Sequence, residues 1–398
     1  MTRLQAAVFV ALTVVIGACS GGTAILANPA AARPSLPPAT PAPTRPADPL
    51  PVVLPRDDGP HDRLTEWWYY TGHLRADDGS RYGFEYVIFR AERGRFPVSW
   101  VSHLALTDEA GDRFLYSQRL AVGDQVDRSP RGADGEPTGF DLSLVAADPA
   151  DPTAEPGPAW TMRGSDGHDR LDAMLGPAEA AAAGAPGGIG LDLTLAATKA
   201  PAFHDHDGWI DFGPAGGSYY YSRTAMTATG SLTLDGRPLR VEGTSWFDHQ
   251  WGDFISVGGG GWDWFAVNLA DGTDLTLSLV READGSYPLV YGTVVDPDGT
   301  VRHLDRDAFS VEVTDRWVSP SSGADYPAAW TVRIPGEDLV IKLHPTVADQ
   351  ELDTRATTGV IYWEGSQVVQ AMRGGVALGG EGYVELTGYA GSTALGAP

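Results

Sequence analysis

Aromatic and ionisable side chains are concentrated in one stretch of the chain, residues 245–265, which reads SWFDHQWGDFISVGGGGWDWF. Asp248 and His249 stand side by side near its start, among several tryptophans. A few polar groups among many aromatic faces are typical of the wall of a binding pocket. A carboxylic acid kept dry by aromatic neighbours holds its proton more easily, so Asp248 could protonate an alkene.

An alkene that accepts a proton becomes a cation, which aromatic faces attract. The residues expected to face such a ligand are Trp246, Trp251, Trp262, Trp264 and Phe265. A water molecule must then be positioned or deprotonated, a role open to His249 or Tyr219, with Tyr221 beside the cation. Because adjacent residues of a strand point to opposite faces, His249 would oppose the acidity of Asp248 only in an irregular segment. The alternative is that these tryptophans only pack and that Asp248 caps backbone amides.

His204 and His206 form the one arrangement that suggests a metal, since residues two apart share one face of a strand. No third ligand can be identified in the sequence, so a solvated loop before Trp209 is the favoured interpretation. No metal or other cofactor is therefore expected. Glu66 is interpreted as part of a first core strand, held there by a salt bridge.

Hydrophobic alternation with a period of two predicts β-strands along most of the chain, for example at Leu191, Leu193 and Leu195. Asp-Gly pairs separate these runs and favour tight hairpin turns. Only residues 177–183, which are rich in alanine, indicate a short helix. We expect an all-β fold of antiparallel strands, in barrels or sandwiches.

Two segments of the sequence are echoed further along the chain. Residues 67–74 can be aligned with 262–269, and residues 241–246 with 384–389. The echoes predict two similar β-domains, at 56–246 and 262–398, joined by a connector at 247–261. A chance match between tryptophan-rich strands is the alternative.

The N-terminal residues predict export. Residues 1–19 resemble a lipoprotein signal peptide, with an apolar run too short to span a bilayer and Cys19, the only cysteine, at the lipidation position. Residues 20–55 are rich in proline and alanine and predict an extended tether. We expect a protein exported and lipid-anchored to a bacterial membrane, at the cell surface or the periplasmic face. The net charge of -24 argues against nucleic-acid binding.

Seven motifs together resemble those of the AttH-like superfamily, which includes the carotenoid 1,2-hydratases, also called hydroxyneurosporene synthases. They are EWWYYTGHL, YYYSRT, WFDHQWG, GWDWF, DQEL, YWEG and GYVELTGY, and they span nearly the whole chain after the tether. The resemblance implies two lipocalin-like β-barrels packed side by side, with a ligand cavity at or near their junction. Some members of the superfamily are hydratases of acyclic carotenoids, and others are similar to pericyclases.

The resemblance also implies site residues. In the hydratases a catalytic aspartate lies in the motif that corresponds to WFDHQWG, which carries over to Asp248, with Trp246 two residues before it. Positions about 30 residues upstream fall by spacing on Tyr219 and Tyr221. This chain departs from the hydratases in having His249 and Gln250 after the aspartate and tyrosines upstream.

The leading functional hypothesis is a lipid-anchored double barrel that binds an apolar ligand, such as an isoprenoid, at its junction and hydrates or cyclises it with Asp248 as the acid. A carrier protein that binds the same ligand without turnover is the competing hypothesis. A metal-dependent hydrolase using His204 and His206 is the third. The expected partners are the apolar ligand and the membrane, and a monomer is favoured.

Overall fold

The computed structural model describes residues 47–145, 157–254 and 259–390, so the predicted signal peptide, Cys19 and most of the tether lie outside the described residues. Contacts divide the chain after Asp48, and the fold below belongs to the unit that begins at Pro49. None of the helices in the described ranges is both long and apolar enough to cross a membrane.

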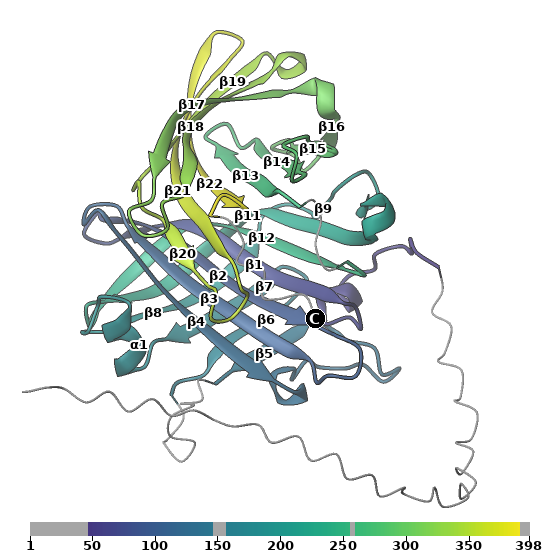
Figure 1. The fold of residues 1–398 in the computed structure, drawn as a ribbon, viewed down its shortest axis with the longest axis vertical. Coiled ribbons are helices and arrows are strands. Elements are labelled where there is room, and N and C mark those ends of the chain that lie inside the picture. Colours follow the sequence, from purple (N-terminus) through teal and green to yellow (C-terminus); the bar gives the residue numbers. More distant parts are fainter. Residues whose placement is uncertain (1–46, 146–156, 255–258, 391–398) are drawn as a thin grey trace, which may run out of the picture. The chain divides into compact units, whose positions relative to one another are not determined.

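The first sheet contains twelve antiparallel strands and curls around its own core (Figure 1). Its strands are β1 (Thr65–Ala76), β2 (Arg81–Ala91), β3 (Ser99–Asp108), β4 (Arg113–Val122), β5 (Phe140–Leu144), β6 (Trp160–Ser165), β7 (His168–Met174), β8 (Ile189–Ala197), β9 (Ala202–Phe203), β10 (Trp209–Asp211), β11 (Gly217–Leu234) and β12 (Arg237–Gly252). They are hydrogen-bonded in the order β4-β3-β2-β1-β12-β11-β8-β7-β6-β5, and β9 and β10 both pair with β11.

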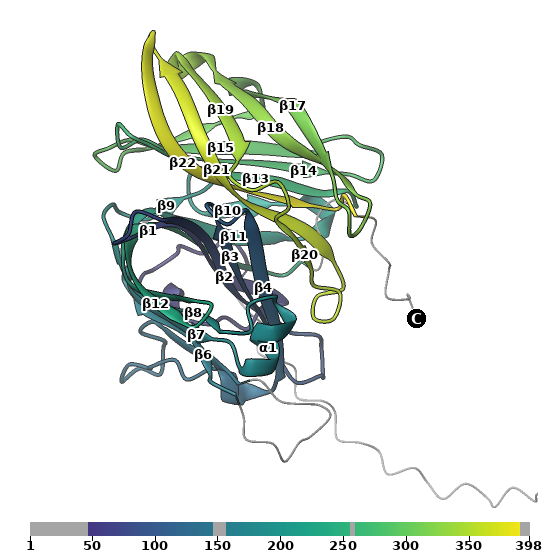
Figure 2. The same cartoon turned by 90° about the vertical axis from the view of Figure 1, so that its left-hand side faces the viewer.

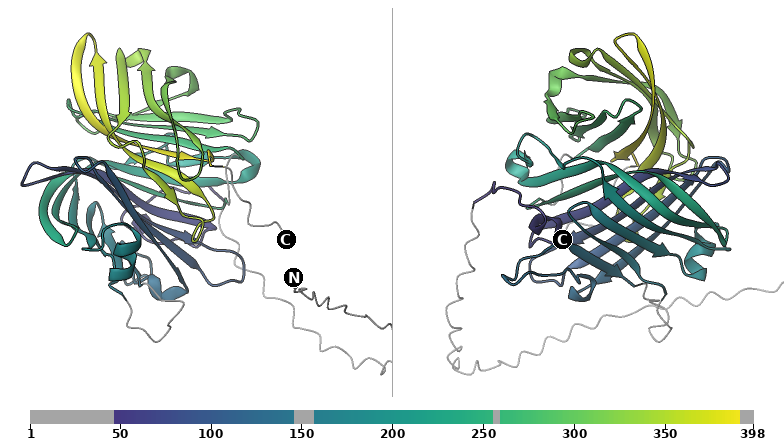
Figure 3. Two further views of the ribbon diagram at one scale, coloured as in Figure 1. Left: turned by 60° about the vertical axis from the view of Figure 1, so that its left-hand side comes forward. Right: turned by 180° about the vertical axis from the view of Figure 1, so that it is seen from behind.

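The second sheet contains ten strands and has the same antiparallel character (Figure 3). Its strands are β13 (Gly261–Leu269), β14 (Asp274–Arg281), β15 (Leu289–Val295), β16 (Val301–Leu304), β17 (Ser310–Val318), β18 (Asp325–Ile334), β19 (Leu339–Pro345), β20 (Glu351–Asp353), β21 (Ile361–Arg373) and β22 (Val376–Thr387). Their order is β16-β15-β14-β13-β22-β21-β19-β18-β17, with β20 paired to β21.

Helical structure is confined to short pieces in the described ranges. The expected alanine-rich helix is α1 (Pro177–Ala182). The remaining pieces are 3-10 turns, namely η1 (Arg56–Asp58), η2 (Asp124–Val126), η3 (Gly213–Ala215), η4 (Arg306–Ala308) and η5 (Pro335–Glu337). The prediction of an all-β fold with two lipocalin-like barrels is confirmed.

Each sheet buries the alternating residues that the sequence indicated. In the first sheet Leu191, Leu193 and Leu195 enter one large core cluster, and Leu275 and Leu277 enter the core of the second. The residues between them on each strand point outward, as the two-residue period requires. Each sheet therefore encloses a hydrophobic core of its own.

The outer faces of the two sheets meet along β1, β2 and β11 on one side and β13, β14, β21 and β22 on the other (Figure 2). A small aromatic cluster fills this contact and consists of Tyr69, Val87, Trp246, Trp264, Ala266 and Tyr383. The hairpin formed by β20 and β21 also reaches β3 and β4, where Leu352 and Tyr362 pack on Ala105. We call this contact between the sheets the junction.

In both sheets the strand that carries the first echo pairs with the strand that carries the second. Residues 67–74 lie in β1, which pairs with β12, and residues 262–269 lie in β13, which pairs with β22. The second echo, 241–246 and 384–389, lies on those partner strands or directly after them. The registers differ, since Tyr69 lies opposite Asp248 whereas its counterpart Trp264 lies opposite Glu385, the counterpart of Glu242. The pairing therefore does not decide between duplication and a chance match.

The first sheet extends beyond the expected domain boundaries at both ends. β12 continues to Gly252, so residues 247–252 of the expected connector belong to a strand. At the other end Val52 and Leu54 pack against the first core, and the Leu50 amide donates a hydrogen bond to the Tyr219 hydroxyl at 2.7 Å. The last residues of the predicted tether are therefore part of the fold.

Candidate functional site

The side chains of β12 alternate between the junction and the interior of the first sheet. Trp246 belongs to the junction cluster, whereas Phe247 and Trp251 belong to the first core. Asp248 follows Trp246 onto the junction face, and His249 follows Phe247 into the interior. The strand is regular here, so the two ionisable neighbours point to opposite faces and belong to separate clusters.

Three donors hold the Asp248 carboxyl group at the junction. The Tyr220 hydroxyl donates to Oδ2 at 2.6 Å, the Trp246 indole N–H donates to Oδ1 at 2.7 Å, and the Ser222 hydroxyl also donates to Oδ1. Burial raises the pKa of Asp248 to about 6, although these three donors favour the charged form and oppose the shift. The carboxyl group is dry but fully hydrogen-bonded.

A second layer of partners holds the donors in place. The Trp264 indole N–H donates to the Tyr220 hydroxyl at 3.0 Å. Because Ser222 donates to Asp248, the His204 Nε2–H must donate to Ser222, over 2.7 Å, and His204 Nδ1 must accept from Thr293 at 2.9 Å. Burial lowers the pKa of His204 to about 3, which agrees with a neutral ring. The network joins both sheets, since Trp264 and Thr293 lie in the second.

A bulge in β11 decides which residues of that strand meet Asp248. β11 ends at a two-residue hairpin, Asp235 and Gly236, both with positive φ. Followed back from this hairpin toward its start, β11 pairs regularly with β12 until the register shifts between Met226 and Arg223. Beyond this shift Ser222, not Arg223, lies opposite Asp248. One inserted residue exchanges the faces of all β11 side chains on the far side of the shift from the hairpin, so Tyr220 points to the junction.

Glutamates from both sheets are buried at the junction near Asp248. Glu85 of β2 and Glu364 of β21 are at most 1% exposed, and Glu385 of β22 is partly buried. The Tyr362 hydroxyl donates to Glu85 at 2.9 Å, and the Tyr69 hydroxyl donates to Glu364 at 2.8 Å.

The second carboxyl oxygens of Glu85 and Glu364 are buried without a hydrogen-bond partner in the described ranges. Burial raises the pKa of Glu85 to about 8 and that of Glu385 to about 7. Burial and the neighbouring carboxyl groups also raise the pKa of Glu364 well above its usual value. Glu85 and Glu364 therefore remain mostly neutral acids near pH 7, whereas Glu385 titrates at that pH, and all three can donate protons.

Replacement of Glu85 by glutamine is expected to remove part of the pH dependence of stability. Glu85 keeps its proton up to about pH 8 when folded, whereas the unfolded side chain loses it near 4.5. The stability it contributes is therefore complete below pH 4.5 and is lost as the pH rises to 8. At pH 8.5 the variant should be more stable than wild type by on the order of 1–3 kcal/mol, measured by thermal unfolding.

The two proteins should be alike at pH 4.5, because glutamine resembles the protonated acid. Glu312→Gln, at an exposed position, is the matched control and should change the unfolding midpoint at neither pH. An equal midpoint for Glu85→Gln and wild type at pH 8.5 would show that Glu85 is already charged in the fold.

The predicted site residues fall into three groups. Trp246 donates to Asp248, Trp264 donates to Tyr220 beside it, and Trp262, 36% exposed, lies on β13. Phe265 packs instead in the second core, with its ring centroid 5.6 Å from that of Trp330. The remaining predicted residues, His249, Tyr219, Tyr221 and Trp251, belong to the interior of the first sheet.

Sequence reasoning missed Tyr220, Ser222, Tyr69 and the glutamates. A signal for some of them was present: Glu364 and Glu385 lie in the motifs YWEG and GYVELTGY, and Tyr220 lies in YYYSRT. No spacing rule, however, links Glu85 to Glu364 across the two sheets.

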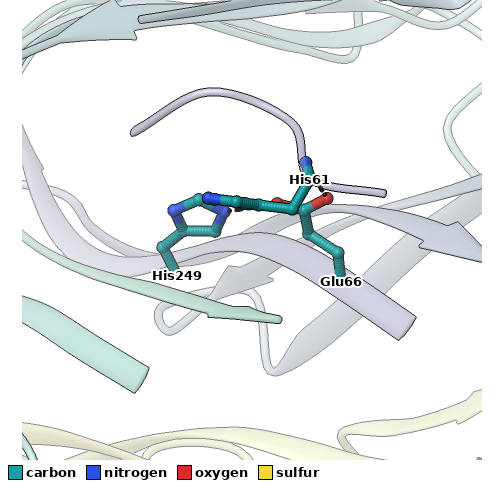
Figure 4. A group of neighbouring side chains, drawn as sticks. All are labelled: His61, Glu66 and His249. Atoms are coloured by element: carbon teal, nitrogen blue, oxygen red, sulfur yellow. Dashed lines mark hydrogen bonds and ion pairs between the residues drawn. The ribbon is translucent and has the colours of Figure 1, made fainter. Parts of the chain in front are cut away.

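The interior face of β12 carries a separate group of ionisable residues (Figure 4). His249 Nε2 lies 2.9 Å from Glu66 Oε1, and His61 Nδ1 lies 2.7 Å from the same oxygen. Burial favours the neutral form of Glu66, yet the two histidines outweigh it and lower the pKa of Glu66 to about 2. Glu66 does have its expected ionic partners, but it belongs to a cluster and is not an ordinary core pair.

His204 and His206 do not form the alternative metal site. Both ring nitrogens of His204 are occupied by hydroxyl groups, and His206 is exposed, with its ring centroid 4.2 Å from that of His303. His206 also has a left-handed backbone with φ of 74°, so the two residues do not follow the regular alternation of a strand.

Two cavities are found away from the junction. One of about 470 Å³ is lined by residues of β5 to β8, including Arg163 and Asp169, and one of about 330 Å³ is lined by β17 to β19. Asp248 borders neither of them.

Comparisons with known proteins agree with this architecture. A family model described as AttH-like matches residues 45–389. The crystal structure of a putative AttH from Nitrosomonas europaea is similar with a TM-score of 0.69 and 29% identity, over 87% of this chain and 99% of that one. Kievitone hydratase from Nectria haematococca shares the fold, with a TM-score of 0.60 and 16% identity over 85% of this chain and 93% of its own.

One curated protein resembles part of the chain. The dehydratase asqC of Emericella nidulans is 27% identical over 173 residues, which are 41% of this chain and 48% of that protein. The chain thus spans about half the length of the curated relative it matches.

Proposed function

The chain belongs to the AttH-like family, and from that premise we propose that it is a lyase of the hydratase or dehydratase type. The proposed substrate is an apolar alkene, such as an isoprenoid, or the corresponding alcohol, bound at the junction. A hydratase and a dehydratase among the similar proteins support the reaction type. The substrate is proposed from the aromatic character of the junction.

The observation that carries the proposal is the set of buried carboxyl groups between aromatic side chains at the junction. Asp248 is 3% exposed, and the rings of Trp246 and Trp264 lie 6.0 Å apart between their centroids. Glu85 and Glu364 are also buried at the junction, where their dry surroundings keep them neutral. Carboxyl groups in such surroundings can protonate carbon, which a solvated carboxylate cannot do near pH 7.

The reaction needs only these groups and water. In hydration, the Asp248 carboxyl proton passes to one alkene carbon, and the cation on the other carbon faces Trp246 and Trp264. Water adds to that cation, and its surplus proton returns to the Asp248 carboxylate. Dehydration is the same sequence reversed, with water as the leaving group.

The test is incubation of the purified full chain with acyclic carotenes in ¹⁸O-labelled water. Mass spectrometry should detect an alcohol heavier than the substrate by one molecule of ¹⁸O-labelled water, formed at a rate proportional to the protein concentration. Tertiary alcohols of the same carbon skeleton are the reverse substrates. Absence of conversion in both directions, despite measurable binding, would contradict the lyase.

A second candidate is an apolar-ligand carrier without turnover. It is favoured by one observation, namely that the Asp248 oxygens already accept three hydrogen bonds from the protein. A carrier would show saturable quenching of tryptophan fluorescence by the carotene and no labelled product.

We also propose that the protein is exported and anchored to a bacterial membrane through acylated Cys19. Replacement of Cys19 by alanine is expected to move most of the protein from the membrane fraction to the soluble exported fraction and to abolish labelling by radioactive palmitate. The measurement is immunoblotting of the separated fractions. A variant that stays in the membrane fraction would show that another segment holds the protein there.

A further inference from the structure

A three-residue cluster lies on the interior face of β12, opposite to Asp248. His61, Glu66 and His249 bring one ligand atom each to within 4.8 Å of one another (Figure 4). They come from the segment before β1, from β1 itself and from β12. We propose that these three side chains bind one divalent transition-metal ion, of which Zn²⁺ is the best match.

The types of the ligands support this proposal. Two imidazoles and one carboxylate form a donor set that binds Zn²⁺ and related ions and leaves at least one coordination position open. Donor atoms about 2.0–2.2 Å from a tetrahedral ion lie about 3.3 Å from one another. The distances to Glu66 Oε1, 2.7 Å from His61 Nδ1 and 2.9 Å from His249 Nε2, are shorter than this, and all three ligand atoms lie within 4.8 Å of one another, so binding requires small adjustments of the side chains.

The surrounding residues hold the ligands in position. The His61 ring stacks on Trp251, with 4.2 Å between centroids, and the His249 ring stacks on Trp68, with 4.7 Å. The second oxygen of Glu66 accepts the backbone N–H of His61 at 2.9 Å. Because the rings and the carboxylate are already held in place, the side chains lose little conformational entropy when a metal binds.

A further carboxylate stands behind one ligand. His61 Nε2 lies 3.6 Å from Asp57 Oδ1, on the side of the ring away from Glu66. Asp57 in turn is held by the backbone amide of Val53 and by Arg56. A carboxylate behind the outer nitrogen of a histidine is the usual arrangement that orients metal-bound imidazoles.

One atom of the cluster lacks a partner. His249 Nδ1 is buried and accepts or donates no hydrogen bond in the described ranges. An ion bound at His249 Nε2 would leave this second nitrogen as it is, so the proposal rests on the three ligand atoms and not on Nδ1. The His61 side chain is 19% exposed, which provides a route by which an ion could enter.

A bound ion would have a structural consequence. It would tie the segment before β1 to β1 and β12, across one end of the first sheet. Because the ligands lie together only in the folded chain, binding would also stabilise the fold. The sequence analysis predicted no metal, and this proposal is independent of the proposed lyase activity.

The test uses the untagged full chain, freed of metal with a chelator and titrated with Zn²⁺ by calorimetry. We expect one ion per chain that survives gel filtration, and an unfolding midpoint that rises with the Zn²⁺ concentration. Glu66→Gln, which preserves side-chain size, and His61→Asn, which replaces the ring by a smaller polar group, should each weaken binding at least about 100-fold. His206→Asn removes an exposed histidine and should bind as wild type does.

Two results would overturn the proposal. One is the failure of the wild-type chain to retain Zn²⁺, which needs no variant and so does not depend on the folding of any. The other is undiminished binding by both Glu66→Gln and His61→Asn, since the ion would then lie elsewhere.

Discussion

Replacement of Asp248 by asparagine is expected to lower kcat/KM for the proposed hydration by about 10²–10⁴-fold, the usual contribution of a general acid. Asparagine has nearly the same size, and its one oxygen can still accept from the Trp246 indole while its amide N–H donates to the Tyr220 hydroxyl. It has no proton that it can give to carbon. Substrate binding, measured by tryptophan quenching, should change by less than about threefold, because the loss concerns the transition state.

The matched control is Asp263→Asn. Asp263 is also buried, but it lies in the second sheet, where it accepts from the Tyr389 hydroxyl at 3.0 Å and pairs with Arg281 at 3.2 Å. This variant should retain near wild-type activity per folded molecule. Full activity in Asp248→Asn would assign proton transfer to another junction carboxyl group, for which Glu364→Gln is the next variant.

Replacement of Asp58 by alanine is expected to cost the protein about 3 kcal/mol of stability. Asp58 is 1% exposed, accepts the Tyr221 hydroxyl at 2.5 Å and lies 3.3 Å from Arg223, itself 3% exposed. Removal of one partner leaves a buried guanidinium group without its closest charge, and such losses amount to about 3–5 kcal/mol. The lower end applies because Asp166 lies within 3.8 Å of Arg223.

Thermal unfolding measures this loss, which should lower the midpoint by several degrees for a chain of this length. Asp77→Ala is the control, because Asp77 pairs with Arg240 at an exposed site, with side chains 77% and 82% exposed. It should shift the midpoint by less than about one degree. Equal, small shifts in both variants would show that the buried pair stabilises the fold no more than an exposed one.

The two clusters on β12 explain the unusual composition of this strand. Its alternate side chains contact different surroundings, the junction for Asp248 and the interior of the first sheet for His249. The tryptophans are divided in the same way, with Trp246 beside Asp248 and Trp251 beside His249. One strand thus positions both the proposed acid and one of the proposed metal ligands.

The sequence by itself determined the class of the fold. Period-two alternation and Asp-Gly turns depend on neighbours in the chain, and they predicted antiparallel strands and the turn at Asp235 and Gly236 correctly. The echoed segments predicted two similar sheets. Local alternation separates Asp248 from His249 wherever the segment is a regular strand, and the structure has such a strand there, although the sequence analysis assigned both residues to one site.

The partners of Asp248 were decided only by the tertiary structure. With the register set at the hairpin, Arg223 would lie opposite Asp248, and Tyr219 and Tyr221 would share its face. The bulge between Arg223 and Met226 shifts the register by one residue and brings Ser222 and Tyr220 there instead. A single inserted residue exchanges the two faces of a strand, and nothing in the local sequence marks where it occurs.

Long-range packing decided the rest. Glu85 and Glu364 belong to different sheets, and their carboxyl groups approach the same contact only because the outer faces of those sheets meet. His61 meets Glu66 and His249 because its segment folds back against the start of β1. Alternation tells which residues share a face of one strand, but the partner of that face depends on contacts between residues far apart in the chain.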